Sequence, residues 1–337
     1  LEPVRRRPGM YIGGTDERAL HHLAGEILDN AMDEAVAGHA DRITVILESG
    51  NRVTIADNGR GIPVDLHPKF PKKSALEVIM TTLHSGGKFS GKVYATSGGL
   101  HGVGISVVNA LSDTMSVEVA REGKLYRQSY GRGHATSKLD SLGPVKGRKG
   151  TTVSFHPDPE IFGEEARFKP GWLYHMARSK AYLFRGVEIE WRGDPALLKN
   201  EKTIPEKEII YFPNGLLDFL NSELQERPTL TPRAFHGQAD LPGEAGRIEY
   251  AVSWPEDGEG FVHSYCNTIP TPQGGTHESG LRTALTRSLR GYGEMTGNRR
   301  SAAITAEDVM SGAAVLLSVF IREPQFQGQT KEKLTTA

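Results

Sequence analysis

The sequence predicts a chain of the α+β class with two domains. Its 337 residues exceed what one ordinary hydrophobic core organises, so two domains are expected. Apolar residues at helical spacing predict an amphipathic helix over residues 17–37, which Gly38 ends. Alternating apolar residues at 43–47 and 53–55 then predict a pair of strands. Helix and sheet therefore mix within the first part of the chain.

A charged segment over residues 193–212 contains proline and little apolar content, which indicates a domain boundary. We expect a first domain at residues 1–205 and a second at residues 206–337. The second part contains a helical pattern at 278–292 and a continuous apolar run at 314–321, which is typical of a buried strand. Another helix is expected to start at Ile105, and further strands are expected at 115–119, 125–130, 152–155, 248–254 and 262–267.

The composition excludes several classes of protein. No apolar run reaches the ~20 residues that span a bilayer, and the basic start lacks the apolar core of a signal peptide. The sequence has one cysteine, Cys266, so neither an internal disulfide framework nor a cysteine zinc cluster is expected, and Cys266 is interpreted as a small packed residue. Scarce cysteine fits the reducing cytoplasm. The chain does not begin with Met, so we expect it to start inside a longer protein.

The predicted helix at 17–37 carries polar side chains on one face. At about 100° per residue, Glu26, Asn30, Asp33 and Glu34 lie close together around the helix axis. A solvated acidic face is the plain alternative. His22 favours a functional face, because it lies one turn before Glu26, where an imidazole can orient a carboxylate.

The segment Asp57-Asn58-Gly59-Arg60-Gly61-Ile62-Pro63 follows the second strand. Asn-Gly is a strong hairpin signal, so a simple turn is one interpretation. However, Asp57 is in phase with Val53 and Ile55, which places it on the same, buried face. A buried carboxylate needs a hydrogen-bond donor. An amine on a ligand base, an arginine or a backbone amide could each supply it.

A glycine-rich stretch from Ser97 to Gly104 opens directly into the next predicted helix. Glycines let the backbone approach an anion closely, so this stretch is a candidate phosphate-binding loop, with plain flexibility as the alternative. Its spacing fits neither the dinucleotide fingerprint nor the P-loop. The whole region 83–104 is expected to be a long loop. Near the C-terminus, Lys331 alone would be interpreted as a solvated charge.

In this order, these segments resemble the GHKL ATPases, which include gyrase B, the Hsp90 chaperones, MutL and the sensor histidine kinases. The helix with Glu26 and Asn30, the Asp57–Gly61 turn and the Gly99–Gly104 loop match their three nucleotide-binding motifs. The segments at 7–13, 83–89, 274–277 and 329–331 are similar to signatures of the B subunits of type II DNA topoisomerases. Residues 269–273 and 324–329 resemble topoisomerase IV (ParE) more than gyrase.

The resemblance implies a fold and a set of site residues. A GHKL (Bergerat) α/β sandwich would be followed by a transducer domain of the ribosomal-protein-S5-like type. Glu26 would be the general base, His22 would hold it, and Asn30 would coordinate Mg2+. The catalytic residues implied are His22, Glu26, Gln329 and Lys331. The ATP-binding residues implied are Ile27, Asn30, Glu34, Asp57, Arg60, Gly61, Ile62, Pro63, Ile79, Lys88, Tyr94, Gly99, Leu100, His101, Gly102, Val103, Gly104, Thr151 and Lys331.

Within these, the resemblance implies separate tasks. Asp57 would accept a hydrogen bond from the adenine amine, both directly and through a water that Thr151 supports. Arg60 would pair with Glu34 and stack on adenine. Glycine amides would wrap the triphosphate, and Lys331 would reach the γ-phosphate from the second domain. ATP turnover would then drive a DNA strand-passage clamp.

The resemblance also implies partners. These are the ParC subunit of topoisomerase IV in an A2B2 heterotetramer, DNA, and a second copy of the ATPase subunit in an ATP-dependent homodimer. The gyrase B fragment is the nearest alternative, followed by a chaperone or mismatch-repair clamp and by a regulator that binds nucleotide without hydrolysis. Family members carry an arm before the segment matching Leu1, so we expect this chain to bind ATP but to dimerise and hydrolyse poorly.

Arginines also cluster at 282–300 in the second part. Arg282, Arg287, Arg290, Arg299 and Arg300 could form either a patch that faces DNA or a solvated mixed surface. With a net charge of −1, the chain as a whole does not have the basic balance of a dedicated DNA-gripping domain. Any contact with DNA would therefore depend on such a local patch.

Overall fold

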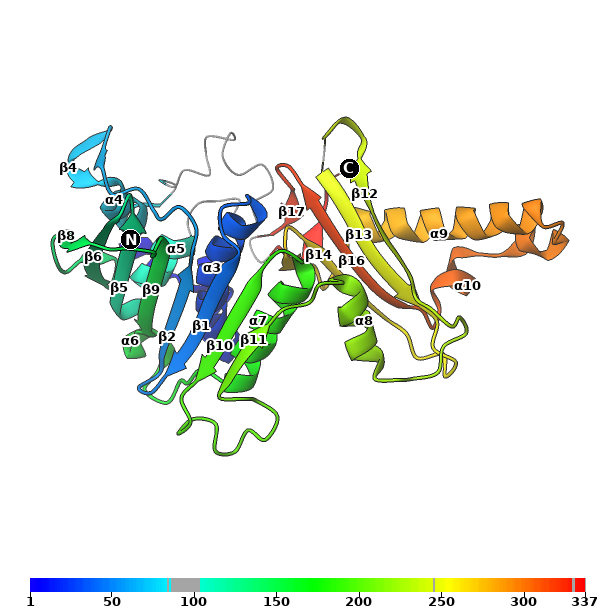
Figure 1. The fold of residues 1–337 in the computed structure, drawn as a ribbon, viewed down its shortest axis with the longest axis horizontal. Helices are drawn as coiled ribbons and strands as arrows, with labels where there is room; N and C mark the ends of the chain where they lie inside the picture. Colours follow the sequence, from blue (N-terminus) through cyan, green and yellow to red (C-terminus); the bar gives the residue numbers. More distant parts are fainter. Residues whose placement is uncertain (84, 86–103, 245, 329–330, 337) are drawn as a thin grey trace. The chain divides into compact units, whose positions relative to one another are not determined.

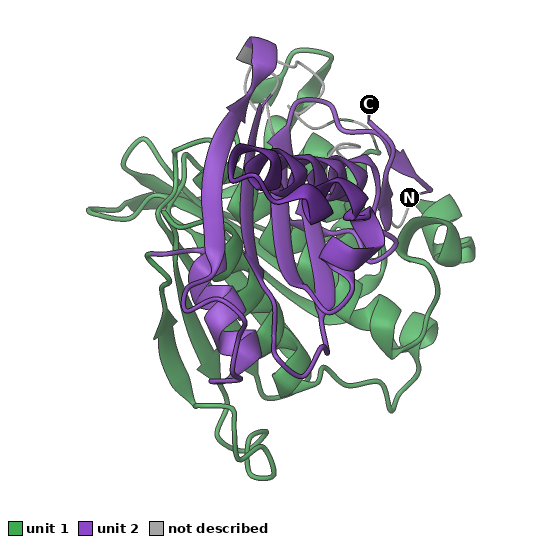
Figure 2. Ribbon diagram, turned by 90° about the vertical axis from the view of Figure 1, so that its right-hand side faces the viewer, with its two compact units in different colours: residues 1–213 green, residues 214–337 purple. Residues whose placement is uncertain are grey.

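The computed structural model describes all residues except 84, 86–103, 245, 329–330 and 337. It divides into two compact units, residues Leu1–Pro213 and Asn214–Ala337 (Figure 2). The boundary lies after the expected one at 205/206. Strand β11 (Lys207–Ile210) causes this difference, because it pairs antiparallel with β10 (Glu188–Gly193) and so belongs to the first sheet. None of the described helices is both long and apolar enough to cross a bilayer.

Unit 1 is a mixed sheet covered by a layer of helices (Figure 1). Nine described strands form the sheet in the order β11-β10-β1-β2-β9-β5-β6-β7, with β8 paired to β6. Its neighbours are antiparallel except β1 and β10, which run parallel. The strands are β1 (Arg42–Glu48), β2 (Arg52–Asp57), β5 (Ser112–Arg121), β6 (Lys124–Gly131), β7 (His134–Ala135), β8 (Asp140–Pro144), β9 (Gly150–Pro157), β10 and β11, and a separate hairpin holds β3 (Leu66–His67) and β4 (Phe70–Ser74).

The helical layer of unit 1 is built around α3 (Glu17–Val36). This helix contacts β1 and β2 and also packs against α5 and α7. Asp16 caps its start by accepting a hydrogen bond from the Ala19 amide at 2.9 Å, and Gly38, at φ 78°, follows its end. The remaining helices are α1 (Glu2–Arg6), α2 (Gly9–Ile12), α4 (Ala75–Thr81), α5 (Gly104–Ala110), α6 (Pro159–Phe162) and α7 (Pro170–Leu183).

Unit 2 is a smaller sheet with helices on it. Its described strands run in the order β12-β13-β16-β14-β15, with β14 and β16 parallel. The elements are α8 (Leu216–Leu224), β12 (Phe235–Leu241), β13 (Gly246–Ser253), β14 (Phe261–Cys266), β15 (Ile269–Pro270), α9 (Thr276–Met295), α10 (Ala306–Met310), β16 (Ala314–Ile321), β17 (Phe326–Gln327) and β18 (Lys333–Leu334).

The core of unit 2 explains the continuous apolar run at 314–321. Every residue of β16 is buried, because α8 and α9 both contact this strand. Val315 and Leu317 share an apolar cluster with Leu281 and Leu285 of α9. Cys266 is also fully buried, beside Val319 and Leu334, as expected of a packed residue, and burial raises the pKa of its thiol to about 12.

Leu317 provides a test of this packing. It is fully buried, so Leu317→Ala removes apolar contacts and leaves a cavity, and the free energy of unfolding should fall by about 2–5 kcal/mol. Leu289→Ala is the matched control, because Leu289 is 39% exposed on α9 and its loss should change stability by no more than about 0.5 kcal/mol. Urea unfolding followed by circular dichroism measures both. Equal effects of the two substitutions would contradict the described core.

Candidate functional site

The candidate site lies in unit 1, where α3 faces the turn after β2. On α3, the His22 Nε2 atom lies 3.1 Å from the Glu26 Oε1 atom, one helical turn away. The Glu26 side chain is only 19% exposed, Asn30 and Glu34 are half-buried, and Asp33 is buried. These exposures exclude a fully solvated acidic face. The polar side of α3 is therefore covered by other parts of the protein.

The turn after β2 is fixed to α3 by one ion pair. The Glu34 Oε1 atom accepts from Arg60 Nη2 at 2.7 Å, while Oε2 accepts from the Arg60 amide at 3.0 Å and from Nε at 3.3 Å. This is the pair that the resemblance implied. Because the Glu34 side chain is 12% exposed, the bidentate contact is stronger than an ordinary surface pair. It holds the Asp57–Gly61 backbone against the helix.

Asp57 takes two backbone donors on a single oxygen. Its Oδ1 atom accepts from the Gly59 amide at 2.8 Å and from the Thr151 amide at 3.4 Å. Of the donors left open by the sequence, the backbone amide is thus present. In the described part of the chain, the other oxygen, Oδ2, has no hydrogen-bond partner. It is free to accept from a ligand.

The surroundings of Asp57 favour its protonated form. Burial raises the pKa of the carboxyl to about 6, and the nearby Glu34 carboxylate also raises it, whereas the Gly59 and Thr151 amides lower it. The backbone of β9 packs closely against Asp57 and keeps its surroundings buried. Gly150 begins β9 with φ 104°, and a Cβ there would lie 2.0 Å from the Asp57 carbonyl oxygen, so only glycine fits.

Thr151 connects Asp57 to the next part of the turn. Its Oγ1 atom accepts from the Ile62 amide at 3.1 Å, and its own amide faces Asp57. Ile62 and Ile79 are half-buried and pack against the core of unit 1, while Pro63 is exposed. Ile27 lies inside that core at 3% exposure. Three of the four residues expected to line an adenine pocket thus belong to, or pack against, the core of unit 1.

Gly104, the first residue of α5, lies against Glu26. A Cβ on Gly104 would lie 2.0 Å from the Glu26 Oε2 atom, so any side chain at this position would displace the carboxylate. Along α3, the structure thus places Gly104 beside Glu26 and the Asp57 turn beside Glu34. The predicted residues Lys88, Tyr94, Gly99, Leu100, His101, Gly102, Val103 and Gln329 lie outside the described residues, and Lys331 lies in unit 2 with φ 57°.

Sequence reasoning missed Arg121, at the end of β5. Its Nη1 atom donates to the Gly61 carbonyl at 3.0 Å. Its buried Nε atom has no hydrogen-bond partner among the described residues, although the Glu122 Oε1 atom lies 3.5 Å away. The guanidinium therefore adds a positive charge beside the Asp57 turn. The segment Arg121-Glu122-Gly123 has the pattern of an ordinary hairpin turn, so nothing local in the sequence indicated this contact.

The side chains near Glu26 suit a metal ion that takes most of its ligands from water and phosphate oxygens. The described residues contain no group of three or more histidine, cysteine or acidic side chains that could hold a metal. Asn30 lies on α3 between Glu26 and Glu34 and offers one amide oxygen. Magnesium keeps several waters and is usually bound by few protein ligands together with substrate phosphates, so this residue fits it.

Helices on one face of a mixed sheet, a histidine-held glutamate and a carboxylate at a glycine turn define a GHKL-type ATPase domain. Comparisons with known proteins agree with this class. The family described as histidine kinase-, DNA gyrase B- and HSP90-like ATPase matches residues 15–161, and the DNA gyrase B family matches residues 215–337.

The chain is 60% identical to the B subunit of DNA topoisomerase 4 from Bartonella bacilliformis, over 100% of this chain and 48% of that protein. It thus spans about half the length of the curated relatives it matches. Among solved structures, it is similar to the 43K ATPase domain of Thermus thermophilus gyrase B in complex with an aminocoumarin, with TM-score 0.81 and 37% identity over 99% of this chain and 84% of that one.

It is likewise similar to the topoisomerase IV ATP-binding domain of Francisella tularensis in complex with a small-molecule inhibitor. The TM-score is 0.79 and the identity 34%, over 100% of this chain and 86% of that one. The chain therefore belongs to the family of ATPase domains of bacterial gyrase B and topoisomerase IV.

The raised pKa of Asp57 makes a prediction about stability. Since the folded pKa is about 6 and the ordinary value 3.8, the folded state holds this proton more tightly than the unfolded state between about pH 4 and 6. The contribution of Asp57 to stability should therefore fall as pH rises through this window, by roughly 1–2 kcal/mol. This is less than the full pKa shift would give, because solvent screens part of the effect at a half-buried side chain. Asp57→Asn should remove that decrease.

The measurement is urea unfolding at a series of pH values without nucleotide. Asp65→Asn is the control. Asp65 is exposed, and its substitution removes the same charge from a nearby position in the same segment. A pH dependence that persists in Asp57→Asn, or that disappears equally in Asp65→Asn, would show that Asp57 is not its source.

Proposed function

We propose that this chain is the ATP-binding and ATP-hydrolysing part of the ATPase subunit of a bacterial topoisomerase IV. The observation that carries the proposal is the set of contacts around α3. His22 and Gly104 border the Glu26 carboxylate, and Glu34 on the same helix fixes the turn that presents Asp57. Helix α3 thus carries the catalytic base and also holds, through Glu34, the turn next to the carboxylate that recognises adenine.

In the proposed mechanism, Asp57 Oδ2 accepts a hydrogen bond from the adenine amine. A water held by Thr151 provides a second hydrogen-bonded link between Asp57 and adenine. Ile27, Ile62, Pro63 and Ile79 contact the purine, and Arg60, fixed by Glu34, covers its face. Glu26 takes the proton of the attacking water, and His22 keeps the carboxylate oriented. Positioning and electrostatics contribute most of the acceleration in phosphoryl transfer, so one well-held carboxylate suits a slow hydrolase.

Residues from several segments are proposed to make the remaining contacts with the nucleotide. Backbone amides from Gly99 to Gly104 bind the phosphates, and Lys88 and Tyr94 contact the nucleotide. By the same resemblance, Lys331 and Gln329 would act on the γ-phosphate, so that hydrolysis would change their contacts. Asn30 would hold magnesium, which would neutralise phosphate charge when bound.

The proposed partners are the ParC subunit of topoisomerase IV, DNA and a second copy of the ATPase subunit, in the bacterial cytoplasm. The 60% identity to a topoisomerase 4 relative supports this choice over the gyrase alternative. The two assignments differ in which DNA-cleaving partner restores activity to the full-length ATPase subunit. Decatenation and relaxation support topoisomerase IV, whereas negative supercoiling supports gyrase.

Two substitutions should separate catalysis from recognition. Glu26→Ala should lower turnover by at least about a hundredfold, because the base is lost, while ATP affinity changes little. Asp57→Asn should instead weaken ATP binding by about tenfold or more, because the amide presents a donor where an acceptor is needed. Calorimetric titration with a non-hydrolysable ATP analogue, with and without magnesium, and a phosphate-release assay measure both quantities.

Glu17→Ala is the control for Glu26→Ala, because Glu17 is exposed on the same helix. If Glu26→Ala lost affinity together with turnover, Glu26 would have a structural role. If the unsubstituted chain bound no adenine nucleotide, the proposal itself would be wrong.

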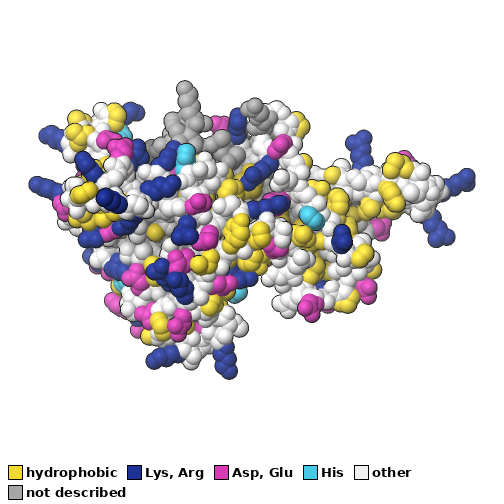
Figure 3. All heavy atoms as spheres, in the orientation of Figure 1, with side chains coloured by type: hydrophobic (Ala, Val, Ile, Leu, Met, Phe, Trp, Pro, Cys, Tyr) yellow, Lys and Arg dark blue, Asp and Glu magenta, His cyan; other side chains and the backbone are white. Residues whose placement is uncertain are grey.

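The arginines of unit 2 offer a route to DNA. Arg282, Arg287, Arg299 and Arg300 are exposed, and Figure 3 shows cationic side chains at the far end of α9. Arg290 is also exposed, but its Nε atom donates to the Ile304 carbonyl at 2.6 Å, so it also fixes the following loop. We propose that this surface contacts DNA phosphates.

Neutralising Arg282 and Arg290 with glutamine should flatten the salt dependence of DNA-stimulated ATP turnover, because fewer counterions are released on binding. The slope of log activity against log salt concentration measures this effect. Arg192→Gln, an exposed arginine of unit 1, is the control. An unchanged slope in the double variant would remove this surface from consideration.

A further inference from the structure

Helix α5 is held at both ends by other parts of unit 1. At its start, Gly104 lies against Glu26. All residues from Ile105 to Ala110 are buried, and at about 1.5 Å per residue the helix is roughly 10 Å long. A short, buried helix of this kind transmits displacement of one end to the other, because close-packed interiors deform little.

The carbonyl groups at the end of α5 accept hydrogen bonds from several other segments. Arg5 Nη1 donates to the Ala110 carbonyl at 2.9 Å, and the amide of Gly133 donates to the Asn109 carbonyl at 3.2 Å. The Asp158 amide donates to the Leu111 carbonyl at 2.9 Å, and Ser112 Oγ donates back to the Val108 carbonyl at 2.7 Å. Of these four donors, Arg5 is the one that uses a charged side chain.

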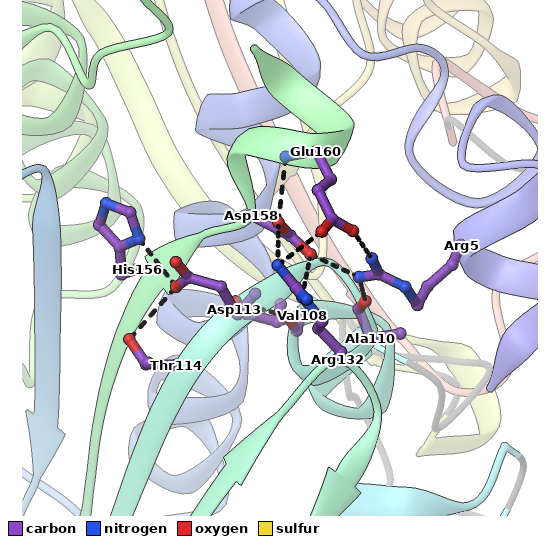
Figure 4. A network of polar contacts seen from close by, with 10 residues as sticks. Arg5, Val108, Ala110, Asp113, Thr114, Arg132, His156, Asp158 and Glu160 are labelled. Carbon is purple, nitrogen blue, oxygen red and sulfur yellow. Dashed lines mark hydrogen bonds and ion pairs between the residues drawn. The ribbon is translucent and has the colours of Figure 1, made fainter. Parts of the chain in front are cut away.

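Arg5 is itself fixed by a buried carboxylate (Figure 4). The Asp158 side chain is fully buried, and its Oδ2 atom lies 2.8 Å from Arg5 Nη1 and 2.9 Å from Arg132 Nε. Glu160 extends the network, 3.1 Å from Arg5 and 3.0 Å from Arg132. Burial alone would raise the pKa of Asp158, but hydrogen bonds from Arg5, the Glu160 amide and Arg132 lower it below its ordinary value.

The two arginines of this network differ in what they touch. Arg5 is 14% exposed and bridges Asp158 to the last turn of α5. The Arg132 side chain is 47% exposed and contacts Asp158 and Glu160 rather than a carbonyl of the helix. Removing either one weakens the ion network. The loss of Arg5 additionally removes a hydrogen bond from the end of the helix whose other end borders Glu26.

We propose that Arg5 is a positioning residue for Glu26: bound to Asp158 and to the Ala110 carbonyl, it fixes α5 along its axis and keeps Gly104 against the carboxylate. The His22 Nε2 atom lies 3.1 Å from Oε1 of Glu26, and Gly104 lies beside Oε2, so each oxygen of the carboxylate has a neighbour that limits its direction. The inference rests on the proposed role of Glu26 as the base. Through it, the N-terminal helix α1 contributes to catalysis without touching nucleotide.

Arg5→Gln tests this inference. It removes the charge but leaves a side chain of moderate length, so the end of α5 loses one of its four hydrogen bonds, the one that ties it to the Asp158 ion network. Turnover should fall about five- to tenfold while the affinity for a non-hydrolysable ATP analogue stays within about twofold, because a small misplacement of a catalytic group affects the rate more than binding. Phosphate release and calorimetry, both well below the melting temperature, measure the two quantities.

Two matched variants separate positioning from general loss of stability. Arg132→Gln removes an arginine from the same buried aspartate and should lower the melting temperature without the loss of turnover. Arg6→Gln removes an exposed pair with Glu2 on the same helix and should change neither. If Arg132→Gln lost as much turnover as Arg5→Gln, or if turnover in Arg5→Gln were unchanged, the inference would be overturned.

Arg5→Lys provides a second variant if Arg5→Gln does not fold. Lysine can pair with Asp158, but its single ammonium cannot reproduce the fork that also reaches the Ala110 carbonyl and Glu160. The same loss of turnover with retained affinity is expected, and wild-type turnover would contradict the inference. Absence of ATP binding by the unsubstituted chain in the same experiment would instead reject the proposed function.

Discussion

The bidentate contact between Glu34 and Arg60 is the interaction on which the rest of the site depends. A carboxylate with 12% exposure is costly to bury unless cations and amides surround it, and Arg60 supplies three donors to it. In return, the contact ties the turn to α3, while Thr151 and Arg121 hold it from the side of the sheet. Asp57 and the Ile62 amide take their positions from that turn, and β9 then packs against it through Gly150.

Local periodicity predicted most of the regular elements that position the site. The helix expected at 17–37 is α3 at Glu17–Val36, and the apolar run at 314–321 coincides with β16. Asp57 was placed on a buried face because strands alternate, and Val53 and Ile55 are indeed buried. These features depend on residues close together in the sequence, so their pattern can be recognised from one sequence alone.

What the sequence did not predict depends on distant pairing. Strand β11 lies in a charged stretch with the composition of a domain boundary, and its pairing with β10 is what assigns it to unit 1. The contact of Arg121 with Gly61 joins residues 60 positions apart. The Arg5–Asp158 pair spans 153 positions, and an arginine in a basic terminal segment resembles a solvated charge until its partner is known. Such contacts are set by topology and cannot be derived from local pattern.

The burial of Cys266 has a practical consequence. It is the one cysteine in the sequence, it has no exposed surface, and its thiol pKa is raised to about 12, so the reactive thiolate is scarce at neutral pH. The natural chain should therefore resist maleimide reagents. A cysteine introduced on the surface of either unit would be the only thiol that reacts readily, which allows dyes or spin labels to be attached at chosen places without first removing the native residue.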